Sequence, residues 1–181
     1  TALKILFVQR GVADEFVEKL VDGVSALTCG MPWTDGVAIT PLPEDNKPEW
    51  LAELVADAVA KGAKVMNAGG GESSGTFFSP AVVYPVSKDA QLYSVEQFGP
   101  IVPVVPFDDV REVLDYVAES DFGQQVSLFG RDAKTLGPLI DELSTQVCRI
   151  NINRQSQRGP DVYPFTGRKN SAEGTLSVRE A

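Results

Sequence analysis

At 181 residues the chain is long enough for one sizeable domain, and 43% apolar with 23% charged residues is typical of a globular protein. A formal net charge of −9 argues against a general binder of nucleic acid or anionic membranes, because both functions need a basic face. The chain has no histidine, which excludes Ser-His-Asp and Cys-His nucleophile systems and zinc sites that use histidine. We predict no metal site.

Targeting and redox features favour a cytoplasmic protein. No apolar run approaches the roughly 20 residues of a membrane span, and the first residues show no basic leader or cleavage site of a signal peptide. The two cysteines, Cys29 and Cys148, lack Cys-x-x-Cys spacing, which fits a reduced compartment. Both are predicted to be inert packing residues, because free cysteine is among the most buried residue types.

The first part of the chain predicts two amphipathic helices. Residues 1–9 form a short apolar run typical of a strand in a covered sheet, and this abrupt start favours a piece of a longer chain. Helices are predicted over residues 13–27 and from Pro48 to about residue 61, because apolar side chains recur at three- and four-residue steps. Residues 30–48 carry four prolines and predict a long loop, of a kind often functional or packed against another part of the protein.

Two strands are predicted next. Residues 63–67 form a short one, and residues 77–86 read as an edge or irregular strand because of their prolines. Between them, the glycine cluster of residues 69–75 matches neither a P-loop nor a Gly-x-Gly-x-x-Gly motif. An extended segment follows it, not a helix that could bind phosphate, so a mobile surface loop is predicted.

From residue 101 onward apolar runs alternate with helical periodicity. Each helix shows an apolar stripe at three- and four-residue steps, and Asp132 is placed to cap the second helix. Alternation at these spacings means right-handed crossovers and a mostly parallel sheet with flanking helices, so the fold class is α/β, in one domain over residues 1–181. The predicted order is strand 101–107, helix 109–119, strand 126–129, helix 133–143 and strand 147–152.

The pattern breaks in residues 153–181, which predict an irregular C-terminal segment. Residues 145–181 hold six basic side chains against three acidic ones, which suggests an anion site in an acidic protein. Arg158, beside a Gly-Pro turn, could present a rigid fork to a phosphate or carboxylate, or could simply solvate a loop.

The segment 96–100, Glu-Gln-Phe-Gly-Pro, forms a stiff corner before a buried strand. Gly99 can take backbone angles closed to other residues, and Pro100 bars the residue before it from the helical region. We place this corner at the mouth of the parallel sheet, where ligands of open α/β folds usually bind. Glu96 is either a solvated turn carboxylate or an acceptor for a sugar diol. Phe98 is either core or an apolar wall for a planar ring.

Several stretches together resemble the aldehyde dehydrogenase superfamily over essentially the whole chain. They are Phe-Ser-Pro at 78–80, Glu-Gln-Phe-Gly-Pro at 96–100, Asn-Ile-Asn at 151–153 and Pro-Phe-Thr-Gly-Arg-Lys-Asn-Ser at 164–171. The segment 157–178 further resembles the NADP-dependent, non-phosphorylating glyceraldehyde-3-phosphate dehydrogenases of that superfamily.

The resemblance implies roles for four residues. Glu96 would bind the nicotinamide ribose hydroxyls and Phe98 would lie near the nicotinamide. Arg158 would contact the phosphate of a small phosphorylated aldehyde, and Thr1 would belong to the substrate site. The cofactor would be NADP, with NAD possible. Family members transfer hydride from a thiohemiacetal on a cysteine and then hydrolyse the thioester.

The same resemblance places the catalytic cysteine immediately before Thr1, since Thr1 and Ala2 look like the end of a Gly-Gln-Arg-Cys-Thr-Ala segment. The nucleotide-binding half would lie upstream, and the oligomerisation strand, used in a dimer or tetramer, would follow residue 181. The chain alone is therefore expected to be inactive. Three hypotheses stay open: part of a working enzyme for glyceraldehyde 3-phosphate, a non-catalytic structural or partner-binding subunit, or a dehydrogenase for another small anionic aldehyde.

Overall fold

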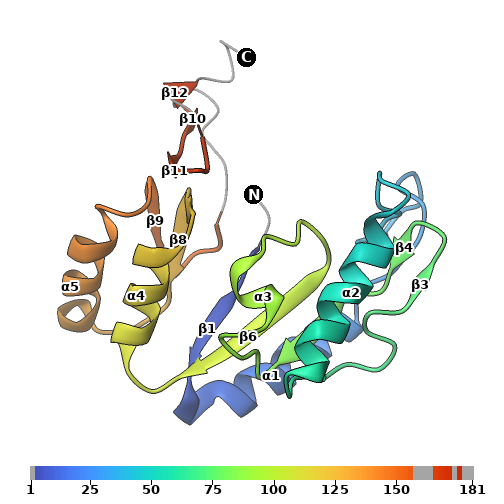
Figure 1. Ribbon diagram of the computed structural model, residues 1–181, viewed down its shortest axis with the longest axis horizontal. Helices are drawn as coiled ribbons and strands as arrows, with labels where there is room; N and C mark the ends of the chain where they lie inside the picture. Colours follow the sequence, from blue (N-terminus) through green and yellow to red (C-terminus); the bar gives the residue numbers. More distant parts are fainter. Residues whose placement is uncertain (1–2, 157–164, 173–174, 177–181) are drawn as a thin grey trace. The chain divides into compact units, whose positions relative to one another are not determined.

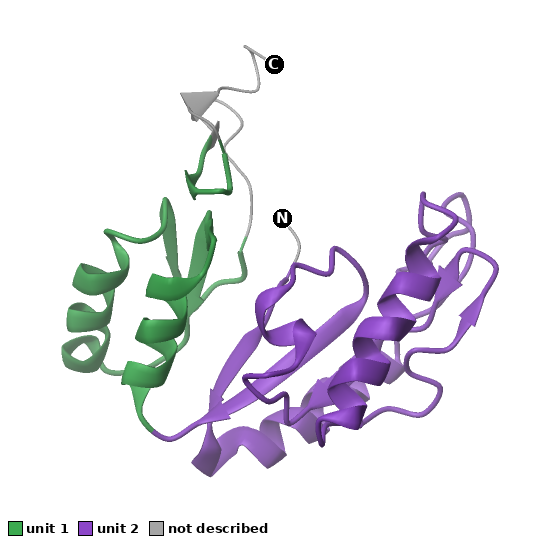
Figure 2. Ribbon diagram, in the orientation of Figure 1, with its two compact units in different colours: residues 1, 109–181 green, residues 2–108 purple. Residues whose placement is uncertain are grey.

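The computed structural model describes residues 3–156, 165–172 and 175–176. These residues fall into two compact units (Figure 2), which we call the N-terminal unit, residues 3–108, and the C-terminal unit, the described residues from 109 onward. The prediction that residues 1–181 form one domain stays a prediction. None of the described helices has the length and apolar composition needed to cross a bilayer.

A four-stranded sheet of order β1-β6-β5-β2 organises the N-terminal unit. Figure 1 shows β1 beside β6. The central strand β6 is parallel to both of its neighbours, whereas β2 runs antiparallel to β5 at the edge. The mostly parallel α/β sheet predicted from the sequence is therefore confirmed. The strands are β1 (Leu6–Gln9), β2 (Lys64–Val65), β5 (Ala81–Tyr84) and β6 (Ile101–Phe107).

Helices cover both faces of this sheet. One buried cluster joins Ala13 and Val17 of α1 (Arg10–Ser25) to Val82 and Val104. The other joins α2 (Lys47–Ala60) to the opposite face of the same two strands. Because successive side chains of a strand alternate between faces, β5 and β6 supply both clusters. The residues of the second cluster on these strands are Ala81, Val83, Ile101 and Val105.

The prediction that residues 77–86 form an edge or irregular strand was wrong for β5, which lies inside the sheet between β6 and β2. Pro80 and Pro85 flank the strand and leave its own N–H groups available for the ladders on both sides. Residues 77–78 instead form β4 (Phe77–Phe78), which pairs antiparallel with β3 (Ser73–Ser74). The glycine cluster therefore ends in a short hairpin, and no helix follows it.

The central strand contains two prolines, Pro103 and Pro106. The ladder with β5 covers residues 101–103 of β6, and the ladder with β1 covers residues 104–107. Pro103 lies in the ladder with β5 and Pro106 lies in the ladder with β1. The missing N–H of each proline can therefore face the side on which it has no ladder partner. The stagger of the two neighbours explains how a central strand accepts prolines.

The C-terminal unit repeats the predicted alternation. Helix α4 (Val110–Glu119) starts with a capping box made by Asp109 and Glu112, and α5 (Ala133–Leu143) is capped by Asp132 as predicted. Strand β8 (Gln125–Leu128) is parallel to β9 (Arg149–Ile152). The short strands are β7 (Phe122–Gly123), β10 (Phe165–Thr166), β11 (Arg168–Lys169) and β12 (Thr175–Leu176).

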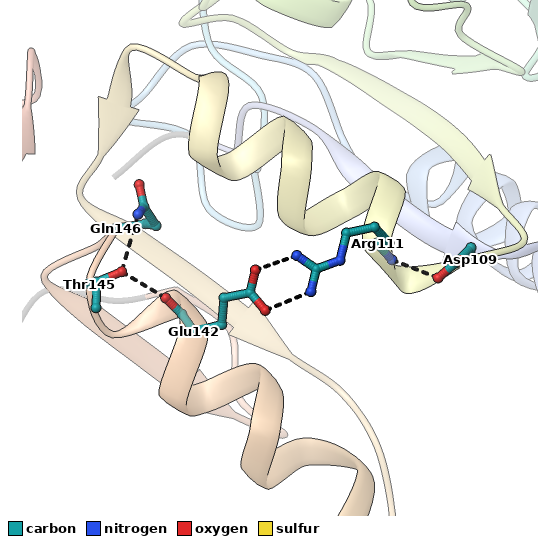
Figure 3. A network of polar contacts seen from close by, with 5 residues as sticks. All are labelled: Asp109, Arg111, Glu142, Thr145 and Gln146. Carbon is teal, nitrogen blue, oxygen red and sulfur yellow. Dashed lines mark hydrogen bonds and ion pairs between the residues drawn. The ribbon is translucent and has the colours of Figure 1, made fainter.

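Polar contacts hold the two helices of this unit (Figure 3). The guanidinium of Arg111 donates from Nη1 to Oε1 of Glu142 at 2.6 Å and from Nη2 to Oε2 at 2.9 Å. A planar fork with two parallel bonds is the strongest geometry of such a pair. Both side chains are exposed, so we expect the pair to contribute little to stability despite this geometry.

Candidate cofactor-binding site

The corner of residues 95–100 links α3 (Gln91–Ser94), a short helix absent from the sequence prediction, to the start of β6. It lies at the amino ends of the parallel strands, because β6 begins directly after it and runs parallel to β1 and β5. The expected placement at the usual ligand-binding mouth of an open α/β sheet, the carboxyl ends, was therefore wrong. The backbone is bonded to β5, since Ala81 N donates to Pro100 O at 2.9 Å, and a local bond from Ile101 N to Gly99 O at 2.8 Å closes the turn into β6.

Phe98 is the residue with the unusual backbone, and its ring is exposed. Its φ is 39°, in the left-handed region that bulky side chains rarely occupy, and 59% of its surface is accessible. An exposed ring held in this conformation is not part of the core, which rules out the core interpretation of Phe98. Its role as an apolar wall stays a prediction.

Gly99 is needed for space and not for its backbone angles, contrary to the sequence interpretation. Its φ lies outside the left-handed region, but a Cβ at this position would come within 2.6 Å of Leu51 Cδ1. Leu51 belongs to α2 and is fully buried, so it has little room to move aside. The glycine therefore lets the corner pack directly on α2.

Glu96 is half-buried, so it is not a fully solvated turn carboxylate. Burial raises the pKa of the Glu96 carboxyl above its ordinary value, and the Lys4 ammonium opposes this rise. Lys4 donates from Nζ to Tyr93 O at 2.9 Å, and burial lowers its pKa to about 8 while Glu96 acts to raise it. A carboxylate with a lysine nearby at the rim of the sheet can accept hydrogen bonds from paired hydroxyls.

Gln97 is a site residue that sequence reasoning missed. It is fully buried, and its Nε2 donates to Leu3 O at 3.0 Å, Lys4 O at 3.0 Å and Ile101 O at 2.9 Å. A carboxamide has two N–H hydrogens, so three acceptors require at least one shared hydrogen. Nothing in the local sequence distinguishes this glutamine from a solvated turn residue, because two of its partners lie more than 90 residues away in the chain.

The two cysteines differ in their exposure. Cys29 is exposed, so its prediction as a buried packing residue was wrong, and Cys148 is half-buried. Cys29 follows α1 and Cys148 directly precedes β9, so neither belongs to the segments that build the corner. No group of carboxylates and thiols among the described residues could hold a metal ion.

Thr1 and Arg158 lie outside the described residues, so their predicted substrate roles stay predictions. Two other basic residues of the segment 145–181, Arg168 and Lys169, donate hydrogen bonds to backbone carbonyls. Lys169 donates from Nζ to Val117 O, Ala118 O and Ser120 O, which caps the carboxyl end of α4. Arg168 donates from Nη1 to Thr145 O at 3.3 Å.

Comparison with known proteins gives a consistent result over the whole chain. The model of the "Aldehyde dehydrogenase family" matches residues 1–181. An NADP-dependent glyceraldehyde-3-phosphate dehydrogenase of Streptococcus equinus is 34% identical over 179 residues, covering 99% of this chain and 37% of the relative. A glutarate-semialdehyde dehydrogenase of Pseudomonas aeruginosa is 36% identical over 170 residues, covering 93% of this chain and 35% of the relative.

Solved structures agree. The NADP-dependent glyceraldehyde-3-phosphate dehydrogenase of Bacillus halodurans, complexed with NADP, superposes with a TM-score of 0.91 at 32% identity. The match covers 99% of this chain and 37% of that chain. The chain thus spans little more than a third of the length of the relatives it matches.

Proposed function

The chain belongs to the aldehyde dehydrogenase family, and on that premise we propose that it is the catalytic-domain portion of an NADP-dependent enzyme. The proposed reaction oxidises glyceraldehyde 3-phosphate to 3-phosphoglycerate through a cysteine thioester. The observation that carries the proposal is the corner, where a half-buried carboxylate and an exposed ring stand two residues apart on a backbone pinned to β5 and packed on α2.

The corner residues fit the nicotinamide end of the cofactor. Glu96 would accept hydrogen bonds from the two ribose hydroxyls, which its two carboxylate oxygens can serve together. The exposed ring of Phe98 would form an apolar wall beside the nicotinamide. NADP, when bound, supplies the hydride acceptor. NAD remains the second candidate, because the residues that would read the 2′-phosphate belong to a nucleotide-binding domain.

The proposed nucleophile is a cysteine immediately before Thr1. Its thiolate would add to the aldehyde carbon to give a thiohemiacetal. Loss of hydride from that carbon to the nicotinamide would leave a thioester, which water would then cleave to the acid and the free thiol. Neither Cys29 nor Cys148 lies on the corner segments. We therefore propose that this chain alone is inactive and needs a nucleotide-binding half, in a cytoplasmic homo-oligomer.

The proposed substrate is a small anionic aldehyde. Arg158, next to a Gly-Pro turn, would hold the phosphate with its planar fork, and Thr1 would line the same site. Relatives of comparable identity include glutarate- and succinate-semialdehyde dehydrogenases. A semialdehyde that carries a carboxylate is therefore the second candidate substrate.

Steady-state kinetics on the complete protein would test the proposal. We expect the highest kcat/KM with glyceraldehyde 3-phosphate and NADP, and complete loss of activity when the cysteine before Thr1 is alkylated. Higher kcat/KM with succinate or glutarate semialdehyde would replace the substrate assignment. Arg158→Ala should raise KM for the phosphorylated aldehyde by at least about tenfold, and an unchanged KM would remove Arg158 from the site.

Two further outcomes concern the whole protein. If the purified material has an intact mass near 19.5 kDa and no companion chain, the proposal of a larger enzyme fails. Absence of activity in the complete protein, with a folded structure, would favour the alternative of a non-catalytic subunit.

A further inference from the structure

We infer that Gln97 is the positioning residue of the corner: its buried carboxamide holds Glu96 and Phe98 in register with the backbone that leads into β1. The inference rests on the proposed function for the meaning of that register, since residues 3–4 follow closely on the proposed nucleophile position. Its structural part rests on the burial and hydrogen bonds of Gln97 and on the backbone and packing of the two residues that follow it.

Gln97 is fully buried. A glutamine in the core costs free energy unless its amide is bonded; here Nε2 donates to three backbone carbonyls, whereas the buried Oε1 accepts no hydrogen bond from a described residue. These carbonyls belong to two different segments, the approach to β1 and the start of β6. An apolar side chain would fill the same volume but would leave Leu3 O, Lys4 O and Ile101 O without this donor.

Gln97 stands between Glu96 and Phe98 in the chain. A shift of its side chain therefore moves both of the residues proposed to contact the cofactor. Phe98 has a φ of 39°, a conformation that persists only where neighbouring contacts enforce it. The carboxamide anchors one side of that residue, and the close packing of Gly99 on Leu51 anchors the other.

Lys4 makes further contacts between the segment before β1 and the residues around the corner. Its carbonyl accepts from Gln97, its Nζ donates to Tyr93 O at 2.9 Å, and Glu96 is the charged group that acts on it. The segment before β1 is therefore bound to the corner through its backbone and to the adjoining helix α3 through the Lys4 side chain. Gln97 bonds to the backbone carbonyl of Lys4, so this contact does not depend on the charge of the Lys4 side chain.

The test uses the complete protein with Gln97→Met, which keeps the length of the side chain and removes the amide. In the cofactor-free protein we expect faster hydrogen exchange at the Ala81 and Ile101 amides, which bond to Pro100 O and Gly99 O. With NADPH, followed by its fluorescence, we expect the Kd to rise about tenfold, as for the loss of one to two net hydrogen bonds.

A double-mutant cycle separates positioning from plain stability. In a protein that already carries Glu96→Ala and Phe98→Ala, Gln97→Met should change the NADPH Kd less than about twofold, because the groups it positions are gone. The same tenfold loss in both backgrounds would overturn the inference. Leu114→Ala, a buried change in the C-terminal unit, serves as the control for lowered stability alone.

Further results would distinguish a failure of this inference from a failure of the proposed function. Unchanged exchange at Ala81 and Ile101 in Gln97→Met would overturn the inference whatever the cofactor does. If the wild-type protein does not bind NADPH, or if Glu96→Ala does not weaken binding, the proposed function fails while the exchange result still decides the structural role. If Gln97→Met does not fold, Gln97→Asn, which moves the donor by one methylene, takes its place with the same two outcomes.

Discussion

The two units of the chain are stabilised in different ways. The N-terminal unit has helices on both faces of its sheet and buries large side chains completely, among them Phe78, Leu51 and Leu54. Among the described residues from 109 onward, the buried apolar side chains are Leu114, Leu143 and Val147. Helix caps and an exposed ion pair are prominent there instead (Figure 3).

The difference shows why the candidate corner belongs to the N-terminal unit. A binding group must keep its geometry, and close-packed cores resist displacement more than exposed polar contacts do. The corner rests on Leu51 and holds Gln97 inside the same core. Four predictions test this contrast between a unit with a large buried core and a unit with few buried side chains and prominent helix caps.

The largest effect is expected for a buried phenylalanine. Phe78→Ala should lower the free energy of unfolding by about 3–5 kcal/mol, because Phe78 is 1% exposed and its removal leaves a cavity. Phe129→Ala, at a side chain 70% exposed in the C-terminal unit, should change it by less than about 0.5 kcal/mol. Urea unfolding followed by tryptophan fluorescence reports the N-terminal unit, which holds both tryptophans, Trp33 and Trp50. Hydrogen exchange reports the other unit.

Glycine to alanine changes should have opposite signs at the packed corner and in an exposed helix. Gly99→Ala should destabilise by about 1–3 kcal/mol through overpacking against Leu51. Gly23→Ala, at an exposed position of α1 where a Cβ would meet no other side chain, should stabilise by about 0.5–1 kcal/mol because alanine loses less backbone entropy in a helix. Urea midpoints and hydrogen exchange would measure both, and a neutral Gly99→Ala would mean that the corner is not tightly packed.

The helix caps provide a matched pair. Asp109→Ala should cost about 1 kcal/mol, because the Asp109 side chain accepts from Arg111 N in the capping box of α4. Asn46→Ala, at the start of α2, should cost less, since Asn46 makes no side-chain cap bond. Hydrogen exchange of the first turn of each helix is the measurement. Equal losses at both positions would contradict the view that caps matter more in the C-terminal unit.

The fourth prediction is a pH dependence from Lys4. Its pKa in the folded protein is about 8 against an ordinary value of 10.5, so between these values the unfolded state binds more protons. Stability should therefore rise with pH across this window, and Lys4→Met should lack the rise. The raised pKa of Glu96 acts in the opposite sense at acidic pH, where stability falls as that carboxyl loses its proton.

Urea midpoints from tryptophan fluorescence across this window would measure the difference between wild type and Lys4→Met. Lys64, an exposed lysine of β2, provides the control substitution Lys64→Met. A difference between wild type and Lys4→Met that stays constant with pH would show that Lys4 is not buried against the corner.

Much of the fold could be read from local patterns. The alternation after residue 101, the helix 133–143 and its cap Asp132 all appear as predicted, because helix periodicity and capping depend on residues within four positions of each other. Strand positions were less certain. The interior place of β5 depends on its pairing with β6 and β2, which no local pattern of prolines reveals.

The amino-acid sequence by itself determined the α/β class and the absence of histidine chemistry, and it singled out Glu96 and Phe98 of the corner as candidate site residues. Only the tertiary structure decided which residues of that corner are exposed, which are buried and why Gly99 is there. The physical reason is distance along the chain. Gln97 bonds to Leu3 and Lys4, and Gly99 packs against Leu51, so these contacts exist only once separate segments meet in the core.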